Sequence, residues 1–399
     1  MRFGNLLLLL ALADARQAVD ARHAVDAFGY RAHPLHQSVS TGEAFLQLLR
    51  LHSHSMHTFA HNPLHVNYGR MEEWTGAELI YLDNARRWPI YSQTAHYCPM
   101  LFLSGMSVRG NGSLVVEMGT LSGGSSRCLA AGLAVAARTA HARAPAALPP
   151  VYLAFDAFSL FPKEAMRNMG FTEKHPMFHA HAEAVRKKRS YKKLVWKDVM
   201  VRPVYSGPAL PLPGDIGKTS RLALHRIPPD TAVEVWAIDS AKTHDHFIDQ
   251  AADVWPRLRV GSIIHLMDFA KAQNEFWISE FVLPGDVSVA SVSLVSASWS
   301  FVVNRAPLDW GKVLRWPAKK ANLSTYRREA TCRKISEFYE REIQRAQPPP
   351  ELQQQSATYQ DQTVGQGLKC GRHRPGSWAQ WAHGWLQGHV CRSEDKNDK

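Results

Sequence analysis

Short apolar runs that carry an acidic residue at their ends recur along this chain and constrain its fold more than any other feature. Four such runs cover residues 114–118, 151–155, 232–238 and 262–267. The acids at their ends are, in the same order, Glu117, Asp156, Asp239 and Asp268. Residues 125–138 and 244–258, which lie between runs, have the pattern of helices. Because near-continuous apolar strands alternating with helices are typical of a parallel sheet covered on both faces, the chain is predicted to be an α/β protein.

The pattern changes after the fourth run. Residues 287–295 and 298–303 alternate apolar and polar side chains across a short break, which predicts an antiparallel hairpin. One α/β domain over residues 111–305 accounts for all of these strands. Within it, the stretch of about 157–213 is interpreted as an insertion rich in basic residues.

Other segments are expected on either side of this domain. Capping boxes at Ser40–Glu43 and Thr75–Glu78 precede apolar patterns, so residues 16–110 are expected to form a His-rich helical N-terminal layer. Beyond the domain we expect a basic helix over 306–347 and an extended tail, rich in Gln and Trp, over 348–399.

The chain of 399 residues has a formal net charge of +12, which on its own suggests a nucleic-acid or anionic partner. All of this net positive charge lies in residues 186–202 and 312–334, each of which holds eight basic residues and one acid. The rest of the chain is slightly acidic. A local charge run is more often a solvated helix face than a nucleic-acid groove. Tyr191 and Trp196 interleave with the first run, which keeps an anionic surface or glycan open as a partner.

The N-terminus has the layout of a secretory signal peptide. Arg2 precedes an apolar run over residues 6–12, and small residues at Ala13 and Ala15 suit cleavage after residue 15. The apolar run is too short to span a bilayer, which needs about 20 residues, and no later stretch qualifies as transmembrane. We therefore expect a protein of the secretory pathway, in the ER lumen or secreted, with onward organelle targeting left open.

Five cysteines are too few for a disulfide scaffold. Cys370 and Cys391 bracket the Trp-rich tail and are candidates for one bridge. Cys128 lies in an Ala-rich apolar helix, where a buried, inert thiol is expected.

The residues after the first strand are the sharpest chemical signal. Residues 117–125 read EMGTLSGGS, a strand end, a glycine turn and a helix start. Glycine lets the backbone turn tightly and lets a ligand approach, while a helix N-terminus offers free N–H groups. Ligands of open α/β sheets bind at the carboxyl ends of the strands, so the four strand-end acids are expected to face one crevice.

Residues 115–130, VVEMGTLSGGSSRCLA, resemble motif I of class I S-adenosylmethionine-dependent methyltransferases. Residues 237–269 resemble the strands that follow it in the small-molecule O-methyltransferase branch, the catechol and caffeoyl type. The resemblance covers about half of the chain. It implies a Rossmann-like, mostly parallel seven-stranded sheet with an antiparallel last strand, and S-adenosylmethionine as the cofactor.

By this resemblance, Glu117 and Gly119 line the methionine part of the cofactor, Asp156 accepts from the ribose hydroxyls, and Asp215 lies near the adenine. Gly123 and Ser125 complete the turn and helix start that hold the cofactor. Asp156 also has a physical basis, because an acid after the second strand is the usual ribose partner in dinucleotide folds.

The stretch from Asp239 to Lys242 resembles the Asp-x-x-Lys of that branch, in which the Asp holds a divalent cation such as Mg²⁺ and the Lys helps to deprotonate the acceptor hydroxyl. Asp268 stands at the position of the branch's second metal-binding Asp, but Phe269 replaces the Asn that follows it there. A metal-independent base is the alternative, and His244 is the candidate, with His246 and His265 in the same region.

The function that these observations favour is transfer of a methyl group from S-adenosylmethionine to an oxygen of a small acceptor. Two alternatives stay open. One is a non-catalytic methyltransferase-like module that binds an anionic partner through the basic insertion. The other is a nucleic-acid methyltransferase, which the signal peptide argues against.

Overall fold

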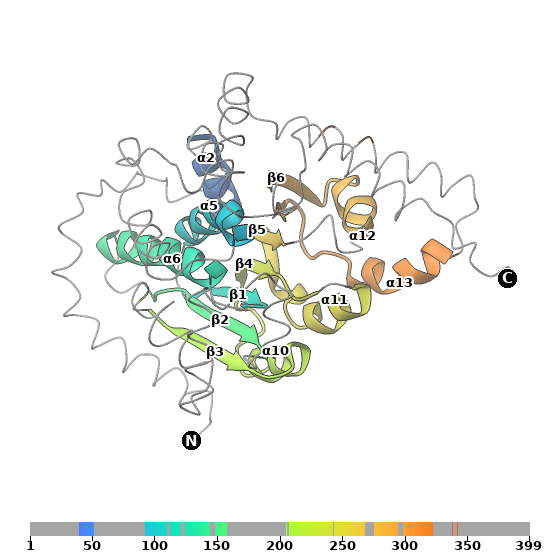
Figure 1. Ribbon diagram of the computed structural model, residues 1–399, viewed down its shortest axis with the longest axis horizontal. Helices are drawn as coiled ribbons and strands as arrows, with labels where there is room; N and C mark the ends of the chain where they lie inside the picture. The colour runs from blue at the N-terminus through green and yellow to red at the C-terminus, as the bar shows by residue number, and fades with distance from the viewer. Residues whose placement is uncertain are drawn as a thin grey trace, which may run out of the picture.

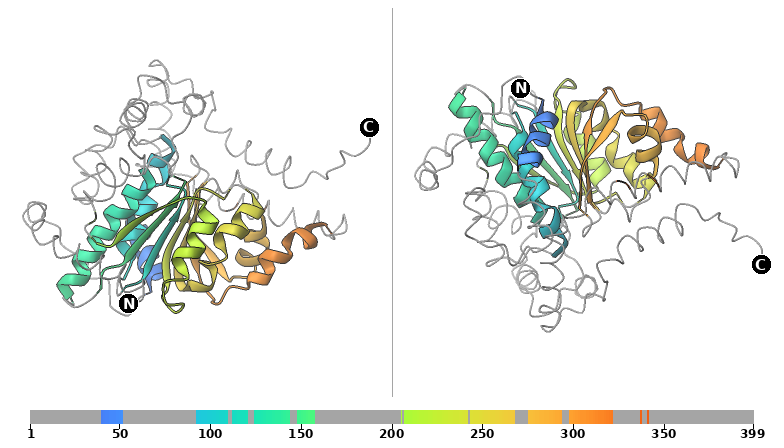
Figure 2. Two further views of the ribbon diagram at one scale, coloured as in Figure 1. Left: turned by 90° about the horizontal axis from the view of Figure 1, so that it is seen from below. Right: turned by 90° about the horizontal axis from the view of Figure 1, so that it is seen from above.

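The computed structural model shows one seven-stranded sheet between two layers of helices (Figures 1 and 2). The residues that it describes are 40–51, 92–109, 112–120, 124–143, 148–157, 205, 207–241, 243–267, 275–293, 298–321, 337 and 341.

The strand order in the sheet is β3-β2-β1-β4-β5-β7-β6. Neighbours from β3 to β5 pair in parallel, whereas β7 is antiparallel to both β5 and β6. This confirms the Rossmann-like sheet with a reversed last strand. The strands are β1 (Leu114–Met118), β2 (Val151–Asp156), β3 (Ala209–Pro213), β4 (Val233–Ile238), β5 (Leu258–Leu266), β6 (Val287–Ser293) and β7 (Ser298–Val303).

The strand β3 was not predicted as a strand, because its sequence ALPLP lies within the stretch interpreted as a basic insertion. Its two prolines, Pro211 and Pro213, are tolerated because β3 is an edge strand with one side unpaired in the sheet. Ahead of β3, the buried Tyr205 donates a hydrogen bond of 2.5 Å to the carbonyl of Pro150, just before β2. The end of the insertion is therefore part of the sheet domain.

One face of the sheet is covered by α2 (Thr41–Leu51), α5 (Ser92–Ser107) and α6 (Gly124–Arg143), as Figure 2 shows. The capping box predicted at the start of α2 is confirmed in part, since the N–H of Glu43 donates to Oγ of Ser40 at 3.2 Å. Small residues let α5 and α6 approach closely: a Cβ at Gly132 would lie 2.1 Å from the carbonyl oxygen of Phe102. Of these helices, α2 and α5 come from the stretch expected to form a helical N-terminal layer, whereas α6 follows β1 and belongs to the predicted α/β domain.

The opposite face is covered by α10 (Ile216–Leu224), α11 (His244–Ala251), α12 (Glu275–Trp277) and α13 (Trp310–Ala321). The helix expected over 244–258 ends at residue 251 and is followed by a 3-10 turn, Trp255–Arg257. A π-helical turn, Ile278–Val282, follows α12. Aromatic side chains fill this half of the core, notably Trp236, Phe247, Trp255, Phe276, Trp277, Phe281 and Phe301.

A half-buried carboxylate connects the helices before β1 to the sheet. Glu234, at the start of β4, accepts hydrogen bonds of 2.8 Å from Oγ1 of Thr41 and from the N–H of Arg109. Burial raises the pKa of Glu234, and these hydrogen bonds oppose the rise. These helices are thus held at the amino ends of the strands, opposite the ends that carry the acids.

Cys128, in α6, is bonded in a disulfide, so the expectation of a free thiol there was wrong. One cysteine in an Ala-rich apolar helix gives no sign in the sequence that it is disulfide-bonded. No helix among the described residues is long and apolar enough to cross a membrane. Outside these residues lie the predicted signal peptide, the predicted capping box at Thr75–Glu78, most of the stretch interpreted as a basic insertion, and the tail with Cys370 and Cys391.

Candidate functional site at the carboxyl edge of the sheet

The carboxyl ends of the central strands meet at one edge of the sheet. The N–H of Gly119 donates to the carbonyl of Phe155 at 2.8 Å, and the N–H of Asp239 donates to the carbonyl of Met118, also at 2.8 Å. The helix after β1, α6, lies on one face and the helix after β4, α11, on the other (Figure 1). A crevice between strands whose helices diverge in this way is where open α/β sheets bind their ligands.

Gly119 makes the turn that leaves β1 and approaches the end of β4. Its φ is +91°, a left-handed conformation that favours glycine. A Cβ at this position would lie 2.9 Å from the backbone nitrogen of Ser240. The backbone of the turn therefore passes directly beside the end of β4, which leaves room for nothing larger than glycine.

Glu117 is 1% exposed and accepts hydrogen bonds from three hydroxyls. Oγ of Ser125 donates to its Oε1 at 2.6 Å, Oγ of Ser126 donates to its Oε2 at 2.6 Å, and the phenol of Tyr152 also donates to Oε2. Burial raises the pKa of Glu117 to about 7, the three hydrogen bonds oppose the rise, and the charge of Asp156 adds to it. Two residues assigned to the cofactor from sequence, Glu117 and Ser125, thus bind one another.

Thr120 follows Gly119 and is buried, and its hydroxyl has no hydrogen-bond partner among the residues that the structure describes. An unsatisfied buried hydroxyl costs about 1–3 kcal/mol. A ligand group that bonds to it would remove this cost. The hydroxyl of Thr120 and the adjacent Gly119 therefore make this turn suitable for binding a polar ligand.

Asp156 and Asp215 lie farther along the same edge. Asp156 is half-buried at the end of β2, and its carbonyl accepts from the N–H of Gly214 at 3.0 Å. Asp215 is exposed and caps α10, since its carboxylate accepts from the N–H of Lys218 at 3.0 Å. The two acids therefore lie close to the start of α10, and their contact with the nucleoside part of a ligand stays a prediction.

Asp239 is half-buried where β4 ends. Next to it, Oγ of Ser240 donates to Oε1 of Gln250 at 2.6 Å, which fixes the end of β4 to α11. Lys242, Asp268 and Gly123 lie outside the described residues. Within the part of the chain that the structure describes, no three His, Cys, Asp or Glu side chains are grouped as a metal site would require. A divalent cation at Asp239 and Asp268 stays a prediction.

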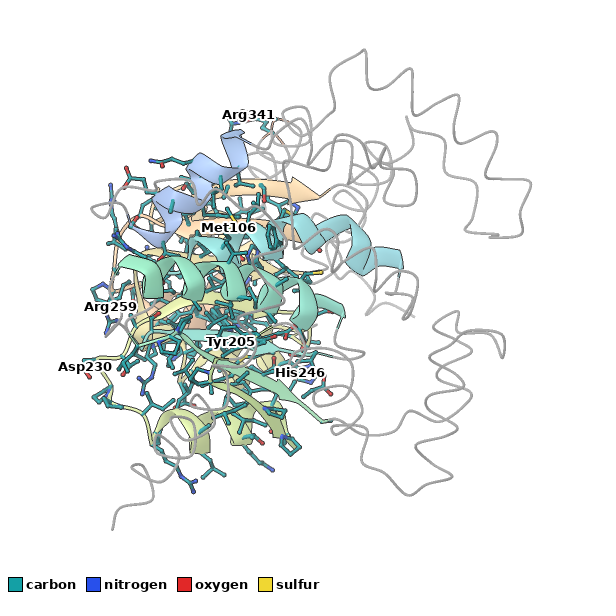
Figure 3. The ribbon with its side chains drawn as sticks, turned by 90° about the vertical axis from the view of Figure 1, so that its left-hand side faces the viewer. Met106, Tyr205, Asp230, His246, Arg259 and Arg341 are labelled. Carbon is teal, nitrogen blue, oxygen red and sulfur yellow. The ribbon has the colours of Figure 1, made fainter. Side chains whose placement is uncertain are left out.

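The histidines considered as bases occupy three different surroundings. Nε2 of His244 lies 3.0 Å from the carbonyl oxygen of Val313 in α13, and its ring packs edge-on against Phe276. His246 is exposed on α11 (Figure 3). His265 is buried, with Nδ1 at 2.7 Å from Oγ of Ser300, and burial lowers its pKa to about 3. His265 is therefore a core residue and is not grouped with the strand-end acids.

Three residues of this edge escaped prediction: Thr120, Ser126 and Tyr152. The pair of serines at the start of α6 was a signal that could have been used, because two hydroxyls there can both reach an acid at the end of the preceding strand. Tyr152 gave less warning, since one tyrosine in an apolar strand usually reflects core packing.

No protein-family model matches the chain, and no curated protein sequence matches it. Two solved structures of CalS11, the calicheamicin methyltransferase, also described as the TDP-rhamnose 3′-O-methyltransferase of calicheamicin biosynthesis, are similar at 13% and 14% identity. Both matches cover 70% of this chain. They cover 96% of the CalS11 chain in the first structure and 98% in the second, and the TM-score is 0.31 for both. A candidate O-methyltransferase from Klebsiella pneumoniae is 14% identical, over 57% of this chain and 90% of its own, also with a TM-score of 0.31. At similarities this low, function has to be argued from the residues of the chain itself.

Proposed function

We propose that this protein is an S-adenosylmethionine-dependent methyltransferase that acts on an oxygen of a small acceptor. The observation that carries the proposal is the glycine turn at Gly119, which lies between diverging helices at the edge where Asp156 and Asp239 also end their strands. The resemblance of residues 115–130 to motif I of class I methyltransferases supports the same assignment.

The charge of this edge suits the proposed ligand. S-adenosylmethionine carries a sulfonium cation and no phosphate, so carboxylates at strand ends attract it where a phosphate-binding loop would not. Asp156 and Asp239 supply such carboxylates. The glycine turn also lacks the Gly-Lys-Ser/Thr of a phosphate loop.

The residues present fit the parts of this cofactor. The hydroxyl of Thr120 and the backbone of Gly119 would contact its amino-acid end, together with the N–H groups at the start of α6. Asp156 would accept from the ribose hydroxyls, and Asp215 would lie by the adenine. When bound, S-adenosylmethionine supplies a methyl group activated for in-line displacement. The task of the protein is then mostly to position the two reactants.

The acceptor side of the reaction is assigned to the end of β4. Asp239 would orient the acceptor hydroxyl, and Lys242 would take its proton, provided that the lysine is held in its neutral form. His244 is the alternative base, although its Nε2 contacts the carbonyl of Val313. A loss of activity in Lys242→Met, with retention in His244→Gln, would favour the lysine, and the opposite result would favour the histidine.

We also propose that the protein matures in the secretory pathway. The layout of residues 1–15 supports this compartment, and the disulfide of Cys128 supports it as well, because disulfides persist in oxidising surroundings. Asn111 and Asn322 each begin an Asn-x-Ser sequon, at which a secretory protein can be glycosylated. The mass of the mature protein tests the proposal: loss of the first 15 residues or a glycan at Asn111 or Asn322 is expected. An intact, reduced, unmodified chain would contradict it.

The methyltransferase proposal is tested by calorimetric titration of the purified chain with S-adenosylmethionine and with S-adenosylhomocysteine. Saturable binding of both, weakened in Asp156→Ala, is expected. Absence of binding of either below millimolar concentration, with the protein folded, would contradict the proposal.

A further inference from the structure

The carboxylate of Glu117 connects β1, β2 and α6 close to the turn at Gly119. It belongs to β1, while Tyr152 comes from β2 and the serines Ser125 and Ser126 come from the first turn of α6. Its partners in register on the neighbouring strands are Ala154 and Ala237. Small side chains at both of these positions are compatible with a carboxylate buried between the strands and α6.

An ionised carboxylate in this place imposes one arrangement on its neighbours. It can only accept hydrogen bonds, so Ser125, Ser126 and Tyr152 must all point their protons at it. Burial and the charge of Glu117 raise the pKa of Tyr152 well above its ordinary value, so the phenol stays protonated and remains a donor. A protonated Glu117 would itself donate from one oxygen, and at least one of the three hydroxyls would have to turn away.

We propose that Glu117 and Tyr152 are positioning residues for the methyl donor: they hold the first turn of α6 so that its N–H groups are oriented before the donor's carboxylate arrives. The inference rests on the proposed function, because it assumes that the donor binds at this turn. The dipole of α6 also stabilises the negative charge of Glu117, because this carboxylate lies near the N-terminus of the helix.

The proposal predicts that donor affinity follows the ionisation of Glu117. Its pKa is about 7, so donor binding that favours the ionised form strengthens as pH rises from 6 to 8, by up to about tenfold. The titratable groups that the structure describes on the adjoining strands are Tyr152 and Asp156 on β2 and Glu234 on β4, and Asp239 follows the end of β4. From α6, the serines face the carboxylate.

The variant Tyr152→Phe separates this role from packing. It keeps the ring and removes only the hydroxyl that stabilises the ionised form of Glu117, so the pH midpoint of donor affinity should move upward and affinity at pH 7 should fall severalfold. Glu117→Gln should bind weakly, with an affinity that does not change between pH 6 and 8. The matched control is Tyr205→Phe, because Tyr205 is equally buried and also loses one hydrogen bond, to the carbonyl of Pro150 (Figure 3).

The experiment is calorimetry with S-adenosylhomocysteine and S-adenosylmethionine at pH 6, 7 and 8, with unfolding measured for every variant. The positioning role is supported if the affinities of the two ligands depend on pH equally. This dependence should be lost in Glu117→Gln, shifted in Tyr152→Phe and unchanged in Tyr205→Phe. A steeper dependence for the cationic ligand would overturn it in favour of direct attraction. Wild-type binding without pH dependence would overturn this inference alone, whereas no binding by the folded wild type at any pH would remove the proposed function as well.

Discussion

The backbone of Gly119 lies so close to Ser240 that a side chain at residue 119 would come within 2.9 Å of the backbone nitrogen of Ser240. The end of β1 and the end of β4 are therefore in direct backbone contact. The two halves of the proposed site, which hold the methyl donor and the acceptor, are joined at this point. Neither strand end can shift without moving the other.

Substitution of Gly119 by alanine should disrupt both halves. The side chain is strained at a φ of +91° and also meets the end of β4, so we expect a loss of about 2–4 kcal/mol in the free energy of unfolding and the loss of donor binding. Urea unfolding and ligand titration measure the two effects. The matched control is Gly285→Ala, at a φ of +82° with nothing within 4 Å of the added Cβ. This control should lose only about 1–2 kcal/mol and bind normally.

Thr120→Val should separate ligand binding from stability. Valine has nearly the shape of threonine and removes a buried hydroxyl that has no partner in the described part of the chain, so the free energy of unfolding should stay the same or rise. Donor affinity should fall by about tenfold, because the hydrogen bond to the ligand is lost. Thr120→Ser, which keeps the hydroxyl, should bind almost normally. Equal affinity in the wild type and Thr120→Val would show that this hydroxyl does not contact the donor.

Stability without ligand should depend on pH through Glu117. The pKa of this carboxyl in the folded protein is about 7, above its ordinary value of 4.5, so the folded state holds the proton more tightly than the unfolded state. The free energy of unfolding should therefore fall as pH rises from about 4.5 to about 7, by roughly 3 kcal/mol from this group. Urea unfolding of the wild type and Glu117→Gln across this range measures the difference. A constant difference between the two proteins would contradict the buried, shifted carboxyl.

Two substitutions of Asp215 distinguish its roles. Asp215→Ala removes the cap of α10 and should lower the free energy of unfolding by about 1 kcal/mol. Asp215→Asn keeps a capping oxygen and removes the charge, so stability should be retained. If Asp215 lies beside the adenine, both variants should weaken donor binding in calorimetry. Normal binding by Asp215→Asn and Asp215→Ala would restrict the residue to capping.

The central strands were predictable because burial on both faces demands nearly continuous apolar sequence. Asp156 and Asp239 are half-buried where β2 and β4 end, whereas Glu117 is fully buried within β1. The strand β3 was not predictable in this way, because an edge strand is only partly buried and its prolines resemble a loop. Glu117 was correctly placed at the edge of the sheet, but its hydrogen bonds were not foreseen. Tyr152, 35 residues later, reaches it only through the pairing of β1 with β2.

Amide hydrogen exchange with and without S-adenosylhomocysteine tests the central claim most directly, because it reports where the ligand binds. The ligand should slow exchange in the turn after β1 and at the start of α6, from Gly119 to Ser126, and leave the opposite edge around Arg259 unchanged. Protection confined to other parts of the chain, or no protection at saturating ligand, would contradict the assignment of this edge as the methyl-donor site.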